Sequence, residues 1–192
     1  MILARELASG TGSAELDFDI LLGRVLDCVP GRADAGRYQR AVEQLLTALF
    51  YPALDNPKLE QHLNAGRKRV DIDYENQATR GFFHWMHDVN KVHCSYVPVE
   101  CKNYNEDPAN PELDQLLGRF STQRGSFGIL CYRTSNDKHL VNQRCRDAIN
   151  AGRGYILALD DEDLKVLVKE RKQLPDGQDF IFLRECFRDL VS

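Results

Sequence analysis

The alternation of strand-like and helix-like segments in the second half of the chain is the feature that most limits its fold. Residues 125–133 and 154–160 are short apolar runs of strand length. Apolar side chains at helical spacing follow each run, over residues 136–152 and 161–173. Strands that alternate with helices build a sheet with helices on its faces, so the sequence predicts an α/β fold.

The first half of the chain and its last segment predict further elements. They are helices over 16–29, 35–50 and 111–123, strands over 67–76 and 92–104, a helical or irregular stretch over 81–90, and a closing strand or helix over 178–192. The predicted architecture is a mixed central β-sheet of about four to five strands flanked by helices. Residues 1–34 are predicted to form an N-terminal tether and a helix, and residues 35–192 the main domain.

Charge, cysteine content and hydropathy exclude several classes of protein. The net charge is -4, so a nucleic-acid partner would have to be met by a local basic patch. The six cysteines lack CxxC spacing, which argues against a disulfide scaffold and a zinc ribbon and predicts reduced thiols in a cytoplasmic protein. No apolar stretch approaches the length of a membrane span and no signal peptide is recognisable, so no membrane partner is expected.

Three polar side chains stand out within two of the predicted strands. Asp71 lies in "RVDID", and Glu100 and Lys102 lie in "VPVECKNY". Residues two apart share one face of a strand, so all three side chains can converge if the two strands pair. Two carboxylates can hold a hard divalent cation, and a lysine beside them can orient a water and screen charge on a phosphate.

This arrangement resembles the active site of the PD-(D/E)XK nuclease superfamily, which has the restriction-endonuclease-like fold. The matching residues are Asp71 on one strand and Glu100-Cys101-Lys102 on the next, and the order of predicted elements matches over residues 38–171. The stretch "GYILALDDEDL" is similar to the fourth strand and following helix of Mrr-like restriction endonucleases. The resemblance implies that residues 35–192 are a nuclease domain, a deoxyribonuclease dependent on Mg²⁺ or Mn²⁺. It also favours an endonuclease over an exonuclease, with a role in restriction or antiphage defence.

The resemblance further implies a role for each residue of the motif. Asp71, Glu100 and the backbone carbonyl of Cys101 would bind the metal, and Lys102 would position the attacking water, leaving a 5′-phosphate and a 3′-hydroxyl. The residue before Asp71 is a valine, where the family name has proline. Asp73 shares a strand face with Asp71 and is the alternative ligand.

Two predicted helices carry further candidates. On the helix over 35–50, Gln39 and Glu43 share a face, and either could contact a metal-bound water, with Glu43 the better ligand chemically. On the helix after the second site strand, Gln115 is a candidate catalytic residue by resemblance. Arg119 shares a face with Gln115 and could hold a phosphate, or it could pair with Asp114 instead.

Basic residues in the middle of the chain predict the nucleic-acid surface. The candidates for phosphate contacts are Arg67, Lys68, Arg69, Arg119 and Arg124. The expected partner is DNA, and RNA stays open as an alternative substrate. Cutting both strands of a duplex needs two sites, which would call for a homodimer, and targeting would call for an additional domain or partner protein.

Two alternatives compete with this nuclease hypothesis. The three polar side chains could form a buried ion-pair cluster that fixes strand pairing, and the fold could be a catalytically inactive nuclease domain that binds nucleic acid or a protein. A zinc site is disfavoured because its candidate ligands lack a paired-cysteine frame; these candidates are His84, His87, His93 and Cys94.

Overall fold

The computed structural model describes residues 17–63, 68–174 and 178–192, so most of the predicted N-terminal tether lies outside the described residues. One open sheet of five strands forms the centre, in the order β1-β2-β3-β4-β5. The strands are β1 (Leu54–Leu63), β2 (Lys68–Asn76), β3 (Tyr96–Lys102), β4 (Phe127–Tyr132) and β5 (Tyr155–Leu159). The pairs β1-β2 and β2-β3 are antiparallel, and β3-β4 and β4-β5 are parallel. The predicted α/β fold with a mixed sheet is thereby confirmed.

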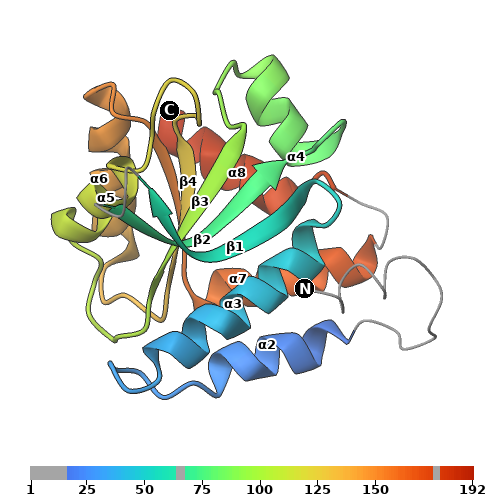
Figure 1. Cartoon of the computed structure of the whole chain (residues 1–192), viewed down its shortest axis with the longest axis vertical. Helices are drawn as coiled ribbons and strands as arrows, with labels where there is room; N and C mark the ends of the chain where they lie inside the picture. Colours follow the sequence, from blue (N-terminus) through green and yellow to red (C-terminus); the bar gives the residue numbers. More distant parts are fainter. Residues whose placement is uncertain (1–16, 64–67, 175–177) are drawn as a thin grey trace.

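Helices cover both faces of the sheet (Figure 1). They are α2 (Phe18–Leu26), α3 (Ala35–Phe50), α4 (Gly81–His84) with a π-helical turn (Trp85–Val89), α5 (Asn110–Leu117), α6 (Lys138–Asn150), α7 (Asp161–Gln173) and α8 (Ile181–Val191). Helices α2, α3 and α7 contact one another on one side of the sheet, and α5 and α6 lie together on the other. None of the helices in the described part of the chain combines the length and the apolar character that crossing a membrane requires.

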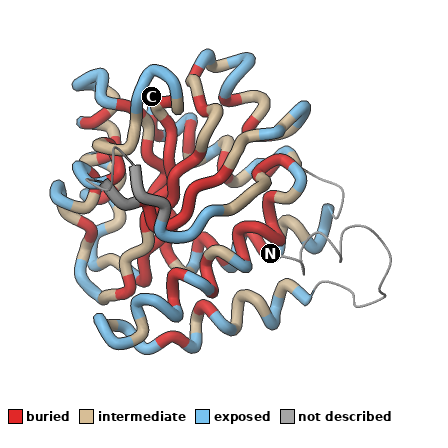
Figure 2. Tube along the Cα trace, viewed as in Figure 1, coloured by how far each residue is buried: buried red, intermediate tan, exposed pale blue. Residues whose placement is uncertain are grey.

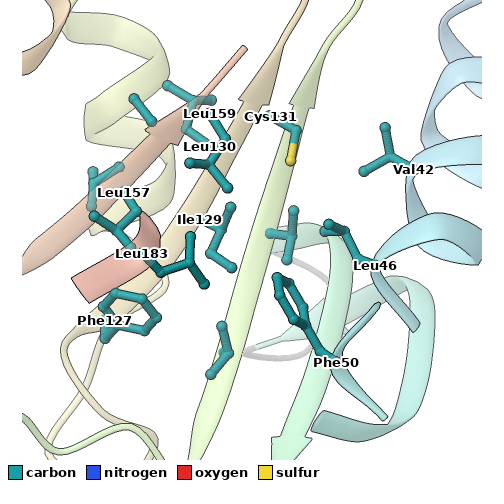
Figure 3. Packing of buried hydrophobic residues seen from close by; sticks show 14 of the residues in the cluster. Val42, Leu46, Phe50, Phe127, Ile129, Leu130, Cys131, Leu157, Leu159 and Leu183 are labelled. Atoms are coloured by element: carbon teal, nitrogen blue, oxygen red, sulfur yellow. The ribbon is translucent and has the colours of Figure 1, made fainter. Parts of the chain in front are cut away.

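The core lies along the central strands, which are buried over most of their length (Figure 2). Phe127, Ile129 and Cys131 on β4 are fully buried, and α3 directs Val42 and Leu46 toward the sheet (Figure 3). Because β4 is covered on both faces, its sequence is a continuous apolar run rather than an alternating one, as is usual for parallel strands.

Helix α2 is fastened to the body by a buried arginine. The guanidinium of Arg133, just after β4, donates from Nη1 to the carbonyl of Val25 at 2.7 Å and from Nη2 to that of Leu26 at 3.0 Å. These carbonyls end α2, where the helix leaves its last acceptors unpaired and carries partial negative charge. The same guanidinium lies over the ring of Tyr38, so one side chain connects α2, α3 and β4.

The structure differs from the sequence-based elements in two places, and it resolves the closing segment, predicted as a strand or a helix. Strand β1 was not predicted, because "LDNPKLEQHL" is polar, contains Pro57 and shows no alternation; pairing with β2, through an irregular register between Asp55 and Lys58, makes it a strand. Helix α5 ends at Leu117 instead of near residue 123, because the chain turns back through the bridge between Ser121 and Gly125. The closing segment is helical.

Candidate functional site

Strand pairing brings Asp71 and Glu100 together. Strands β2 and β3 are antiparallel with Ile72 opposite Val99, and continuing this register by one residue sets Asp71 opposite Glu100. Directly opposite residues point to the same face of a sheet. The backbone N–H of Cys101 donates to Oδ2 of Asp71 at 3.0 Å, which ties the aspartate side chain to the strand that carries the glutamate.

Alternate side chains of β3 lie on opposite faces of the sheet, with the core residue Cys101 on one face and the candidate site residues Glu100 and Lys102 on the other. Cys101 packs against the core beside Cys131 of β4, and burial raises the pKa of its thiol, so the thiol is not a reactive group. Glu100 and Lys102 therefore point to the opposite face, which α5 covers. This alternation explains how an apolar strand can present a carboxylate and an ammonium in one direction.

Lys102 bridges the strand and helix α5. Its Nζ lies 2.9 Å from Oε1 of Glu100 and donates to Oε1 of Gln115 at 3.0 Å. Helix α5 is held in place by buried Leu113 and Leu116, while Gln115 faces outward on the same helix. The structure thus brings Asp71, Glu100, Lys102 and Gln115, which the sequence singled out, into one cluster.

Glu100 has an unusual electrostatic environment. The residue is 1% exposed, and its Oε2 is buried without a hydrogen-bond partner among the described residues. Burial raises the pKa of Glu100 to about 7, and the negative charge of Asp71 adds to the rise, while Lys102 and Arg119 oppose it. At neutral pH this carboxyl is therefore poised between its protonated and ionised forms.

Solvent reaches the cluster from the side of α5. Asp71 is 7% exposed, the side chain of Lys102 is 15% exposed, and Gln115 is exposed. The side chain of Lys102 is therefore more exposed than that of Glu100, which it contacts, and less exposed than Gln115.

The residues present fit a magnesium-like ion. Across the described ranges, no group of three or more His, Cys, Asp or Glu side chains is arranged to hold a metal. Mg²⁺, however, is commonly bound by one or two carboxylates together with water and phosphate oxygens. The unpartnered Oε2 of Glu100, close to Asp71, is a buried acceptor that such a cation would satisfy. The carbonyl of Cys101 as a further ligand stays a prediction.

Helix α3 contributes Gln39 more directly than Glu43. The buried Gln39 donates from Nε2 to the carbonyl of Asp71 at 2.8 Å, which fixes the strand beneath the carboxylate. The carboxylate of Glu43 instead accepts a hydrogen bond from Thr47 at 3.2 Å, and burial raises its pKa. The structure therefore gives Gln39 a supporting role, whereas metal binding by Glu43 stays a prediction.

The two aspartates of β2 have different environments. Nη2 of Arg124 lies 2.6 Å from both Oδ1 and Oδ2 of Asp73, and its guanidinium stacks on Tyr96 at 4.4 Å from the ring centroid. Asp73 is thus paired with a cationic side chain of the same protein, whereas Asp71 lies opposite Glu100 on the neighbouring strand. The prediction of Arg124 as a free phosphate contact does not fit this placement, because its guanidinium is committed to a buried carboxylate.

The other predicted phosphate contacts have different outcomes. Arg67 lies outside the described residues, and Lys68 and Arg69 belong to β2 with side chains that also lie outside them. Arg119 is close enough to Glu100 to lower its pKa, and its Nε is buried without a hydrogen-bond partner within the described chain. Its alternative partner, Asp114, pairs with Arg153 at 2.7 Å instead.

The histidines and Cys94 do not form the disfavoured zinc site. Cys94 is buried and bonded to Asn76, while His84 pairs with Asp88 at 2.8 Å. His93 contacts Ser95 at 2.8 Å instead.

Asn103 was not among the residues that the sequence singled out, yet it connects the site to the α2–α3 connection. It directly follows Lys102, is 4% exposed, and donates from Nδ2 to two backbone carbonyls of the α2–α3 connection. The available signal was a polar residue that continues the motif beyond the end of an apolar strand.

Burial of Glu100 predicts a pH-dependent stability. Its pKa is near 7 in the folded protein against an ordinary 4.5, so its contribution is fully present below pH 4.5 and is lost as pH rises through about 7. We expect Glu100→Gln to have a free energy of unfolding close to wild type at pH 4.5. At pH 8 the variant should be more stable, by up to about 3 kcal/mol. Urea denaturation at both pH values measures this difference.

The matched control is Glu162→Gln, at an exposed carboxylate on α7. It should leave the pH dependence of wild type unchanged. Equal pH profiles for wild type and Glu100→Gln would show that the carboxyl is not perturbed.

No protein-family model matches the sequence, and comparisons with curated proteins and with solved structures find no match.

Proposed function

We propose that the protein is a metal-dependent nuclease that hydrolyses phosphodiester bonds of DNA. The observation that carries the proposal is the pair of carboxylates from Asp71 and Glu100 on adjacent strands, with Lys102 beside them. One buried oxygen of Glu100 has no hydrogen-bond partner among the residues that the structure describes. A buried acidic pair with a raised pKa is common at functional sites and is a poor source of stability.

The order of elements supports the proposal. The order is a leading helix α3, the antiparallel strands β1, β2 and β3, helix α5, strand β4 and helix α6, with α4 and the π-helical turn inserted between β2 and β3. This is the order expected from the resemblance to PD-(D/E)XK nucleases, and the candidate residues lie on β2 and β3, as that resemblance requires.

The chain's own residues would divide the work. Asp71 and Glu100 would hold the cation through carboxylate oxygens, and Gln39 would keep the main chain of Asp71 in place. Lys102, oriented by Gln115, would position the attacking water and offset negative charge that develops on the phosphate. Mg²⁺ or Mn²⁺, when bound, would lower the pKa of a coordinated water and polarise a phosphoryl oxygen.

The test is cleavage of plasmid and single-stranded DNA by the full chain with Mg²⁺, Mn²⁺ or EDTA. Wild type is expected to cut with either metal and not with EDTA. The double variant Asp71→Asn/Glu100→Gln keeps the side-chain shapes and removes both negative charges, so it should not cut.

Glu162→Gln serves as the matched control and should cut at the wild-type rate. Equal cutting by wild type and the double variant would indicate a contaminating nuclease. DNA binding without cleavage in either metal would instead favour the inactive binding domain.

A further inference from the structure

The cations in the middle of the chain are mostly engaged within the protein. Three of them form ion pairs: Arg124 with Asp73, Lys138 with Asp160 and Asp163, and Arg153 with Asp114. Two donate hydrogen bonds to backbone carbonyls: Arg133 to the end of α2 and Arg144 to Pro108. A nucleic-acid backbone could recruit these groups only by breaking existing contacts. Among the residues that the structure describes, phosphate contacts near the site would then come mainly from other cations, on a chain with net charge -4.

Three exposed arginines at the start of α3 are candidates. Arg32, Arg37 and Arg40, together called the arginine rim, lie in the α2–α3 connection and the first turns of α3. Within the part of the chain that the structure describes, Arg32 and Arg40 form no ion pair, and Arg37 has only a 3.4 Å contact to Asp34. The rim therefore presents cationic groups to solvent.

Two hydrogen-bonded connections hold the rim beside the candidate site. Asn103, next to Lys102, donates from Nδ2 to the backbone carbonyls of Val29 and Gly31 at 2.9 Å each. The backbone carbonyl of Asn103 accepts from the N–H of Gly31 at 2.6 Å. On α3, Gln39 is bonded to the backbone of Asp71, as described above. The start of α3 and the chain that leaves β3 lie on the same lower-left side of Figure 1.

The first turn of α3 is also open to an anion. It contains no acidic residue, and the side chain of Asp34 does not cap it, because that carboxylate accepts from the N–H of Val29. Gly36 leaves open space in this turn, with only Arg40 at 4.0 Å from the place of a Cβ. The unpaired N–H groups and the dipole of a 16-residue helix add positive potential to that of the rim.

We propose that the arginine rim binds backbone phosphates of the nucleic-acid strand that the site cuts. This inference rests on the proposed function and adds where the substrate is held. Guanidinium groups and helix N–H groups recognise phosphate without reading bases, so the contact would be independent of sequence. The strand would pass from the start of α3 across the end of β3, where Lys102 lies.

The experiment compares two triple variants of equal charge change by binding to a fluorescent DNA duplex in EDTA. Arg32→Gln/Arg37→Gln/Arg40→Gln removes the rim, and Lys91→Gln/Lys169→Gln/Arg188→Gln removes three exposed cations elsewhere. We expect the rim variant to lose at least about 10-fold in affinity at low salt. The slope of log affinity against log salt should fall by about 2 to 3, since each phosphate contact contributes about 0.9.

At about 0.1 M salt the Debye length is about 10 Å, so the control variant, which keeps the rim, is expected to bind within about 2-fold of wild type under that condition. Equal losses of DNA affinity in both variants, or no DNA binding by wild type, would overturn the proposal that the rim binds phosphates. Cleavage by the rim variant at the wild-type rate and affinity would overturn the rim while leaving the nuclease proposal standing. Rim-dependent binding without cleavage in any metal would overturn the nuclease proposal and support the rim.

Discussion

Replacing Lys102 with alanine is expected to lower the rate of DNA cleavage by about 10³-fold, within the range that a positioned proton-transfer group contributes. The reason is geometric: Nζ of Lys102 lies 2.9 Å from Oε1 of Glu100, and its side chain is more exposed than that of Glu100. Single-turnover cleavage rates, measured with saturating DNA and Mg²⁺, give the comparison.

A pH series separates the role of Lys102 in catalysis from its effect on Glu100. Lys102 lowers the pKa of Glu100, so its removal raises that pKa further above 7 and weakens metal binding at neutral pH. Raising the pH to 9 should restore Mg²⁺ binding by Lys102→Ala, measured by calorimetry, but not its cleavage rate. Full recovery of cleavage at pH 9 would mean that Lys102 acts only by keeping Glu100 ionised.

Lys165→Ala is the matched control for this experiment. Lys165 also pairs with a neighbouring glutamate, Glu162, at 2.6 Å, but it lies on the exposed face of α7. Its removal should leave both cleavage and metal binding unchanged. A comparable loss of cleavage in both lysine variants would contradict a specific role for Lys102.

Replacing Arg124 with alanine is expected to destabilise the fold by about 3 to 5 kcal/mol, as for one partner of a buried ion pair. Asp73 is 1% exposed and would lose both 2.6 Å contacts from Arg124. Burial already raises the pKa of Asp73 despite the arginine, and removing Arg124 would raise it further. The destabilisation should therefore be largest at neutral pH and diminish as pH falls and Asp73 becomes protonated.

The double variant Asp73→Asn/Arg124→Ala is the control for Arg124→Ala. It removes the charge that would otherwise be left buried, so its loss of unfolding free energy should be clearly smaller. Chemical denaturation of both variants at pH 7 provides the measurement. Equal losses in the single and double variants would show that the ion pair is not what Arg124 supplies, leaving its stacking on Tyr96 as the main contribution.

Local patterns predicted part of the site. Alternation along β3 places Glu100 and Lys102 on one face and Cys101 on the other, and this depends on residues close in sequence. The same is true of the helices that follow β4 and β5, whose apolar spacing and capping residues are local. The pairing of β2 with β3, which brings in Asp71, was a condition of the predicted convergence, and the structure meets it.

Features that depend on distant partners could not be predicted in this way. Strand β1 has no strand-like composition and exists because β2 pairs with it. The partner of Arg124 is 51 residues away, and Asn103 bonds to carbonyls more than 70 residues earlier. A single sequence offers no signal for which of many acidic or carbonyl groups such a side chain will meet.

The attachment of α2 bears on where the chain could be shortened. A protein expressed from residue 35 onward would strip the guanidinium of Arg133 of its two carbonyl acceptors and leave the amide of Asn103 without Val29 and Gly31. Val25 and Cys28 also belong to the buried core, so the truncated chain would lose them and expose the face of α3 that α2 covers. We therefore expect a fragment that begins at residue 35 to be less stable than one that keeps α2.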